Sequence, residues 1–525
     1  MNKTSTALVI TGLAVFGACT DYLAVNDNPN GPQSVSANLY LAPMLHWMVT
    51  SPQFDGRFVG HYAQEWYSTT TNTSPPSTWG KMGYDPGSDN GAQQWRDVYW
   101  SLGQNLIDMN TKAEAEQRWD ILGVGMMLKA WGWQVLTDLH GEIIIRQAID
   151  QTRTKFDYDS QDYAYQEVQR LLDSAIVLLK RTDGAVDARY MSVADKIYNG
   201  DRARWLKLAV GMLALSLNHF SNKSSYDPAR VIRLVDSSFT GNSDDPLLAY
   251  PCTSTDFADC NFWGISRNNV TLYRQTQFIV GLMNGTQFGG AVDPRMSRML
   301  AIDSANTTYR GLDVNQSGFG ALTAPQRPRN FFGYVAAPTP GSPSRYIFAD
   351  RSKLPVVTYS ELQFIKAEAA LRSGDAALAK AAYINGISSH FDFVNARNVD
   401  AGQTPTQITA AEKAAFLADT NIVPATVTLS HIMSQKYIAL WGWGHNEIWM
   451  DMRRYNYVDL DPVSGVQVFR GFTAPTSLYA DNVGKIVQRI RPRYNSEYVW
   501  NRDALDAIGG LATDYHTDTL WITKP

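Results

Sequence analysis

The sequence predicts a mainly α-helical protein in which helical hairpins are interleaved with a large loop-rich portion and few short strands. Three observations support this fold class. Apolar residues recur with the 3.6-residue period of a helix over much of the chain, short turns separate successive helices, and two long segments rich in Gly, Pro and aromatic residues interrupt the pattern. Paired antiparallel helices are the repeating unit of α-solenoids, so we expect stacked hairpins.

The N-terminus has the pattern of an export signal. Residues 1–18 contain an apolar run of about a dozen residues, which is too short to span a bilayer and is typical of a signal peptide. Gly17 and Ala18 directly precede Cys19, as in a bacterial lipobox. We therefore expect cleavage before Cys19 and acylation of its thiol, with an ordinary secretory signal as the alternative. Residues 19–36, rich in Asn, Pro and Gly, are interpreted as a lipidated leader.

Residues 37–525 are expected to form a single body, because no charge run or low-complexity linker divides them. The helical period is clearest at 118–139, where the apolar positions on one face are Trp119, Leu122, Met126, Trp133 and Leu136. Further helices are predicted at 162–180, 202–218, 358–372, 375–386, 428–440 and 447–455. The short turn at 373–375 contains a glycine, which suits the end of a helix.

Two regions lack a helical pattern. Residues 66–94 are rich in Thr, Ser, Pro and Gly, and residues 240–350 form a longer segment of the same kind with many aromatic side chains. Loops of this length are uncommon unless they are functional. Within the second region, Cys252 and Cys260 lie in a turn-rich stretch; in an exported protein they could form a local disulfide, and two free thiols are the alternative.

Composition and motifs exclude several functions. The 46 Lys and Arg against 50 Asp and Glu give a net charge of −4, without the basic excess that nucleic-acid binding requires. We find no zinc-protease motif, serine-nucleophile elbow, phosphate-binding loop or dinucleotide fingerprint. We therefore expect no enzymatic activity, no cofactor and no bound metal. A pair of glycosidase carboxylates is the alternative that a sequence alone leaves open.

A binding protein is the remaining class. Aromatic rings on loops can stack on sugar faces, while Asn, Asp and Arg bind hydroxyl groups; the same side chains also suit peptides. Trp119, Trp133 and Trp205 are assigned to packing because they lie on helix faces. The ligand-binding residues that we predict from loop placement are Trp79 and Trp263 first, followed by Tyr84, Trp66, Tyr67, Arg267, Asn268 and Tyr309.

Several segments, in chain order, resemble the SusD/RagB family of outer-membrane nutrient-binding lipoproteins. The closest are Asp-Pro-Arg at 293–295, Tyr-Ser-Glu-Leu-Gln-Phe-Ile-Lys-Ala-Glu-Ala at 359–369 and Gln-Lys-Tyr-Ile-Ala-Leu-Trp at 435–441. The others are 19–23 with 28–30, 139–145, 156–165 with 171–175, 447–454 and 491–497. Together these segments span nearly the whole chain after Cys19.

The resemblance implies four tetratricopeptide-like helix pairs that support a loop-rich remainder. It also implies a lipid-anchored protein on the outer face of the outer membrane, which acts as a lid on a SusC-type TonB-dependent transporter and passes it an oligosaccharide. The helix pairs would face the transporter, and the loops at 66–94 and 250–335 would face the ligand. Buried charge networks are expected from Glu361, Glu368, Asp451, Arg453 and Arg454. Two alternatives remain at this point: the same lid role for peptides, and a structural transporter subunit with no ligand.

Overall fold

The computed structural model describes residues 35–69, 78–85, 91–316, 318–336, 338–402, 407–492 and 494–525. The predicted signal peptide, Cys19 and nearly all of the predicted leader lie outside these ranges. The predicted fold class is confirmed, because helices dominate and the strands are few and short. None of the helices in the described ranges is long and apolar enough to cross a membrane.

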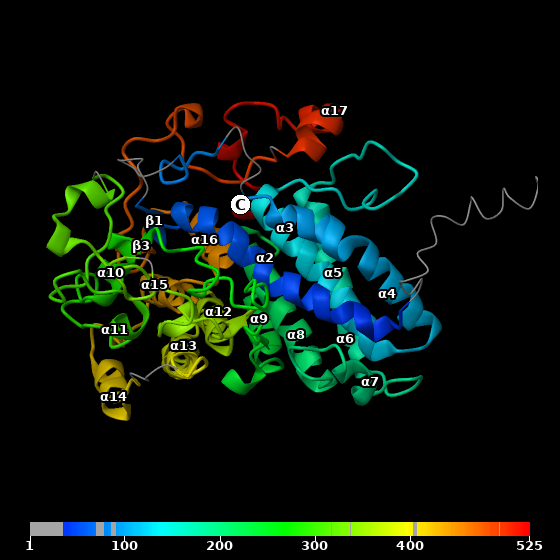
Figure 1. Cartoon of the computed structure of the whole chain (residues 1–525), viewed down its shortest axis with the longest axis horizontal. Coiled ribbons are helices and arrows are strands. Elements are labelled where there is room, and N and C mark those ends of the chain that lie inside the picture. The colour runs from blue at the N-terminus through cyan, green and yellow to red at the C-terminus, as the bar shows by residue number, and fades with distance from the viewer. Residues whose placement is uncertain are drawn as a thin grey trace, which may run out of the picture.

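Two groups of helices make up the framework (Figure 1). The first group comprises α2 (Leu41–Tyr62), α3 (Gln93–Arg96), α4 (Gly103–Ala115), α5 (Trp119–His140), α6 (Gln161–Lys180), α7 (Ala188–Ser192), α8 (Arg202–Asn218) and α9 (Pro228–Asp236). The second comprises α10 (Gln277–Met283), α11 (Met296–Met299), α12 (Tyr359–Arg372), α13 (Ala376–Arg397), α14 (Ala410–Ala418), α15 (Leu429–Leu440) and α16 (His445–Arg454), and α17 (Arg502–Ala507) lies near the C-terminus.

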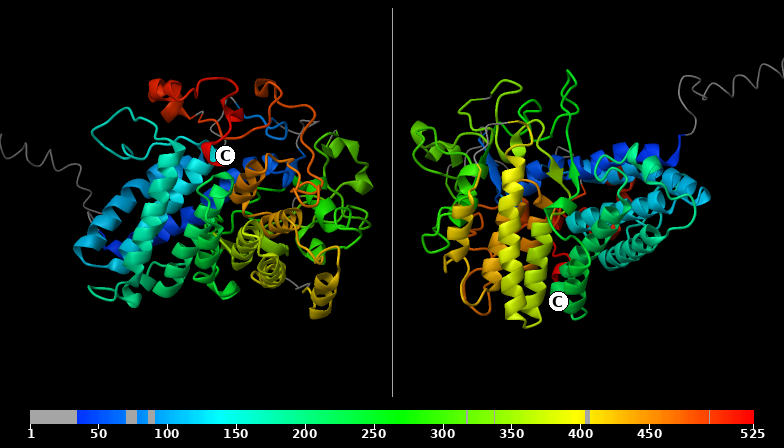
Figure 2. Two further views of the ribbon diagram at one scale, coloured as in Figure 1. Left: turned by 180° about the vertical axis from the view of Figure 1, so that it is seen from behind. Right: turned by 90° about the horizontal axis from the view of Figure 1, so that it is seen from below.

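Neighbouring helices pack in a continuous row. Helix α5 lies against α4 and α6, α6 against α8, α8 against α9, and α9 against α12. The hairpin of α12 and α13 continues the row and appears as two adjacent rods in the right-hand view of Figure 2. The predicted helices at 118–139 and 162–180 correspond to α5 and α6, whereas the helix expected at 375–386 continues to Arg397 as α13.

Local sequence signals begin several of these helices. The Asp201 side chain accepts hydrogen bonds from the first backbone N–H groups of α8, and Ser160 does the same for α6. At α12, Thr358 and Glu361 form a reciprocal capping box. On α6 the apolar residues at helical spacing are buried, including Val168 and Leu172, so burial of one face stabilises this helix against its neighbours.

Two short antiparallel ribbons tie the loop-rich portion to the helices. In the first, β1 (Trp66–Ser68) pairs with β3 (Tyr273–Gln275), with Trp66 opposite Gln275. In the second, β2 (Leu247–Leu248) pairs with β4 (Leu354–Pro355). One large core cluster lies between the helices of the row, and another fills the loop-rich portion.

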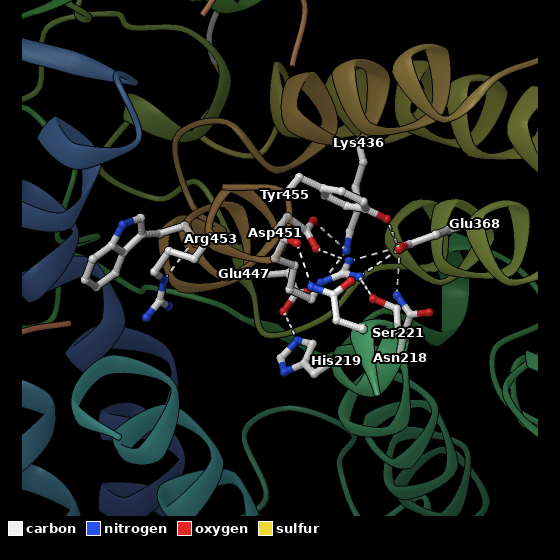
Figure 3. A network of polar contacts seen from close by, with 12 residues as sticks. Asn218, His219, Ser221, Glu368, Lys436, Glu447, Asp451, Arg453 and Tyr455 are labelled. Atoms are coloured by element: carbon white, nitrogen blue, oxygen red, sulfur yellow. Dashed lines mark hydrogen bonds and ion pairs between the residues drawn. The ribbon is translucent and has the colours of Figure 1, made fainter. Parts of the chain in front are cut away.

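A buried polar network connects the two groups of helices (Figure 3). It links the end of α8 to α12, α15 and α16 through Asn218, His219, Glu368, Lys436, Glu447, Asp451 and Arg454. Arg454 donates to both carboxylate oxygens of Glu368, at 2.7 and 3.0 Å, and to Asp451 at 2.6 Å. The charged side chains of α16 in this network therefore also have partners on α12, α15 and the end of α8.

Candidate functional site

Five of the predicted ligand-binding side chains are buried. Trp66, Tyr67 and Trp263 are completely inaccessible to solvent, and Trp79 and Tyr84 are almost so. The prediction that these five rings face solvent is therefore wrong. The physical reason is tertiary packing: the loops that carry them fold back over α2 and α16 and supply rings to the core, where Trp66 and Trp263 lie edge to face.

The other three predicted residues are accessible but lie in two separate places. Arg267 is half-buried and donates to the carbonyl of Ala258, and the neighbouring Asn268 is exposed. Tyr309 is half-buried and lies in a different loop, near Arg345. The structure therefore does not gather the predicted residues into one ligand site.

The turn that precedes Arg267 is closed by a covalent bond. Cys252 and Cys260 form a disulfide in the structure. Inside this turn, the Asp259 carboxylate accepts hydrogen bonds from the backbone N–H groups of Thr253 and Ser254, at 2.7 and 3.0 Å. The disulfide and these hydrogen bonds together define one conformation for the turn.

An open aromatic pocket of about 580 Å³ lies on the helical half of the molecule. It is formed by α3 and the turn that follows it, the loop between α5 and α6, and the segment before α17. Its aromatic lining residues are Trp95, Tyr99, Trp100, Phe156 and Tyr494. Its polar lining residues are Gln93, Arg96, Asn495, Ser496 and Glu497. A pocket of this size with an apolar lining and a few polar groups is the usual form of a small-molecule site.

Two π-helical turns flank this aromatic pocket. The turn at Asp97–Leu102 carries Trp100, whose accessible fraction is 78%, and the turn at Ser496–Trp500 carries Trp500, at 74%. The Asn501 side chain bonds both backbone groups of Phe156, which places Trp500 beside a lining residue. π-Helical turns are rare and frequently occur at functional sites. Trp100 lines the pocket, whereas Trp500 is exposed on the neighbouring turn and is not one of the lining residues. An exposed indole in the lining suits a ligand with a flat apolar face.

Three of the five polar lining residues of the aromatic pocket, Gln93, Asn495 and Ser496, are neutral hydrogen-bonding groups. Glu497, which is the only carboxylate among the described lining residues, is buried and accepts a hydrogen bond of 2.5 Å from the Tyr158 hydroxyl. Burial, followed by the charge of Glu497, raises the pKa of Tyr158, so this phenol remains a neutral donor.

Sequence reasoning missed both exposed indoles, although one signal was present. Around α3, the buried residues Val98 and Leu102 follow helical spacing, as do Trp95 and Tyr99. Trp100 belongs to neither pair, which indicates an outward-facing ring. No comparable pattern surrounds Trp500, because its exposure depends on how the C-terminal segment packs against the loop between α5 and α6.

The described residues contain no group of three or more His, Cys, Asp or Glu side chains placed to hold a metal ion. A row of helical hairpins with long loops and an open aromatic pocket defines a binding protein of the SusD type. The profile of the SusD-like family described as starch-binding and associating with the outer membrane matches residues 29–469, and the chain belongs to this family.

Solved structures share this fold at low sequence identity. A SusD/RagB family protein from Bacteroides thetaiotaomicron is 20% identical, with a TM-score of 0.70 over 93% of this chain and 99% of that one. A SusD homologue from Bacteroides fragilis is 18% identical, with a TM-score of 0.68 over 94% and 100% of the two chains. A chitin-binding SusD homologue from Flavobacterium johnsoniae is also 18% identical, with a TM-score of 0.65 over 93% and 98%. Curated proteins give no match.

Proposed function

We propose that this protein is a lipid-anchored surface protein that binds an oligosaccharide and delivers it, chemically unaltered, to a SusC-type TonB-dependent transporter in the outer membrane. Membership of a family described as starch-binding and associated with the outer membrane supports this role. Similarity in fold to a chitin-binding homologue also supports a glycan ligand. The lipid anchor rests on the sequence pattern at Cys19, because two or more acyl chains hold a protein stably on a bilayer.

The observation that carries the binding function is the aromatic pocket with the exposed indole of Trp100 in its lining and that of Trp500 on the neighbouring turn. Leaving two tryptophans largely in water is unfavourable, since a buried aromatic ring contributes about 2–3 kcal/mol. Trp100 and Trp500 would gain this free energy when a sugar ring covers them. Neutral amide and hydroxyl groups in the lining would bind the sugar hydroxyls.

Calorimetry and affinity electrophoresis with chitin, malto- and cello-oligosaccharides test this proposal. We expect Trp100→Ala and Trp500→Ala each to weaken binding of the best oligosaccharide about tenfold, equivalent to about 1.4 kcal/mol. Trp119→Ala is the matched control, because this half-buried tryptophan begins α5 at the end far from the pocket. Unchanged binding in both pocket variants would reject the site, and binding of a peptide panel in place of all sugars would favour the peptide alternative.

A further inference from the structure

Residues 260–350 have an unusual charge composition. This segment contains eight arginines and four aspartates but no lysine and no glutamate, whereas the whole chain has a net charge of −4. Arginine presents a planar fork that matches a carboxylate or sulfate group in a bidentate manner, which lysine cannot do. The exclusive use of arginine in a loop-rich segment therefore points to recognition of planar or multivalent anions.

The aspartates of this segment already have other partners. Asp293 pairs with the buried Arg295, and Asp303 lies 3.5 Å from Arg310. Asp350 accepts hydrogen bonds from the backbone and side chain of Ser266. Asp313, the fourth aspartate, accepts a hydrogen bond from the backbone N–H of Asn315. None of these four carboxylates, all within the described ranges, forms an ion pair with Arg329 or Arg345.

Arg298 and Arg345 lie near Tyr309, and Arg329 lies near Arg345; we call these three arginines the arginine group. Arg345 Nη1 donates to the carbonyl of Ser297 at 3.1 Å, and Arg298 Nη1 donates to the hydroxyl of the same serine at 3.0 Å. The Tyr309 phenol lies within the electrostatic influence of both Arg298 and Arg345, and Arg345 within that of Arg329. All four side chains are partly accessible.

Backbone and amide oxygens, rather than carboxylates, hold two of these guanidinium groups. Arg345 also donates to the carbonyl of Leu300, and Arg329 donates to the side-chain oxygen of Asn306 at 3.0 Å. Within the described part of the chain, neither Arg329 nor Arg345 pairs with a carboxylate, whereas Arg298 pairs with Glu412 at 3.0 Å. Fixed, uncompensated like charges repel one another, and a bound anion would remove this repulsion.

We propose that Tyr309, Arg329 and Arg345, with Arg298 beside them, form a subsite for an acidic oligosaccharide that carries carboxylate or sulfate groups. The sugar ring packs on the Tyr309 ring, and the guanidinium groups bind the anionic substituent. The subsite rests on the proposed glycan-binding function but is separate from the aromatic pocket, whose lining contains none of these four residues. Figure 1 shows α11, which holds Arg298, at the lower left of the view and α3 of the aromatic pocket near its middle.

Calorimetry on the full mature protein tests the subsite with four probes of equal length: oligogalacturonate, a sulfated oligosaccharide, a neutral chitin oligosaccharide and oligoglutamate. We expect the acidic sugars to bind, and Arg329→Gln and Tyr309→Ala each to weaken their binding about tenfold without affecting the neutral sugar. Raising the salt concentration should weaken acidic-sugar binding, because ions screen exposed charges. Arg233→Gln on α9 is the matched control, since Arg233 is exposed and its ion pair with Asp227 is long, at 3.9 Å.

Arg345→Gln should weaken acidic-sugar binding further, but it also removes two hydrogen bonds to backbone carbonyls. Its melting temperature is therefore measured alongside its affinity, to separate loss of stability from loss of binding. Absence of acidic-sugar binding, equal affinity in Arg329→Gln and the parent protein, or equally tight binding of oligoglutamate would each overturn the subsite. If Trp100→Ala abolishes neutral-sugar binding while acidic sugars fail to bind, the result supports the proposed function and rejects the subsite. If acidic sugars bind through Arg329 while neutral sugars do not bind, the result supports the subsite and rejects the aromatic pocket as a site for neutral glycans.

Discussion

At the scale of single residues, the interior of this protein depends on how each buried charge is compensated. The sequence predicts buried charge networks from five charged residues, and the structure places these residues in different surroundings. Arg454 forms ion pairs with both Glu368 and Asp451. Arg453 instead donates to the backbone carbonyls of Asp138 and Gln488 and stacks on the ring of Trp449, at 3.8 Å. Glu361 caps α12, and burial followed by the charge of Glu447 raises its pKa to about 8.

The bidentate pair of Glu368 and Arg454 gives a stability prediction. Glu368→Gln keeps the shape of the side chain but leaves the Arg454 guanidinium, which has no solvent exposure, with Asp451 as its remaining carboxylate. We expect the free energy of unfolding to fall by about 3 kcal/mol, since breaking a buried ion pair typically costs 3–5 kcal/mol. Urea unfolding measures the change.

The matched control for this prediction is Glu116→Gln. Glu116 pairs with Arg118 on the surface and is 44% exposed, and exposed pairs contribute at most about 1 kcal/mol. Equal effects of the two substitutions would show that the burial of the Glu368 pair has no special energetic importance.

At the scale of secondary-structure elements, the disulfide-closed turn of residues 252–260 is a structural unit in the loop-rich portion. A short covalent loop stabilises the fold mainly by restricting the unfolded chain, and the loop-closure relation gives about 2–3 kcal/mol for the eight-residue separation. We expect the Cys252→Ser/Cys260→Ser variant to lose about this much free energy of unfolding, measured with urea under oxidising conditions.

Reductant supplies the control for the disulfide. The parent protein in reductant should become as unstable as the double variant, whereas the variant itself should not respond to reductant. Peptide mass mapping under non-reducing conditions tests the covalent bond directly, and two free thiols would contradict it.

Helices were more predictable than loops for a physical reason. A helix such as α6 buries one face at fixed spacing, so its apolar period is visible in the sequence. The loop residues Trp79 and Trp263 have no such period, and their burial depends on contacts with residues far away in the chain, such as the bond from Trp263 Nε1 to Gln53 Oε1 at 2.6 Å. Aromatic content therefore located ring-rich loops but did not distinguish core rings from ligand-binding rings.

At the scale of the whole molecule, the row of helices and the loop-rich portion meet around α16. This helix contacts α2 and α5 on one side and α15 on the other. Because its charges are satisfied only when α8, α12 and α15 are also in place, the buried network of Figure 3 couples the two groups of helices. This coupling suits a frame that holds the two proposed sites in fixed positions.

The coupling through His219 predicts a specific dependence of stability on pH. His219, just after α8, is completely buried, with its Nε2 2.8 Å from Glu447 and its Nδ1 3.0 Å from the Tyr165 hydroxyl. Burial alone lowers its pKa, but Glu447 and Asp138 outweigh this effect and raise the pKa to about 9. Lys436, which also contacts Glu447, has a raised pKa and stays protonated throughout this range.

A histidine whose pKa is higher in the folded state than its unfolded value of about 6.5 stabilises the fold below pH 6.5 and loses this contribution as the pH rises to about 9. The raised pKa of His219 corresponds to at most about 3 kcal/mol. We therefore expect the difference in unfolding free energy between the parent protein and His219→Gln to shrink by about this amount between pH 6.5 and 9.

Comparing the two proteins isolates His219 from Glu361 and Asp245, whose pKa values are raised to about 8 and which titrate in both. His46→Gln is the control, because burial followed by Arg267 lowers the pKa of His46 and its contribution does not change above pH 6.5. A difference that stays constant from pH 6.5 to 9 would show that His219 is neutral in the folded protein, and that Glu447 is compensated by Lys436 alone.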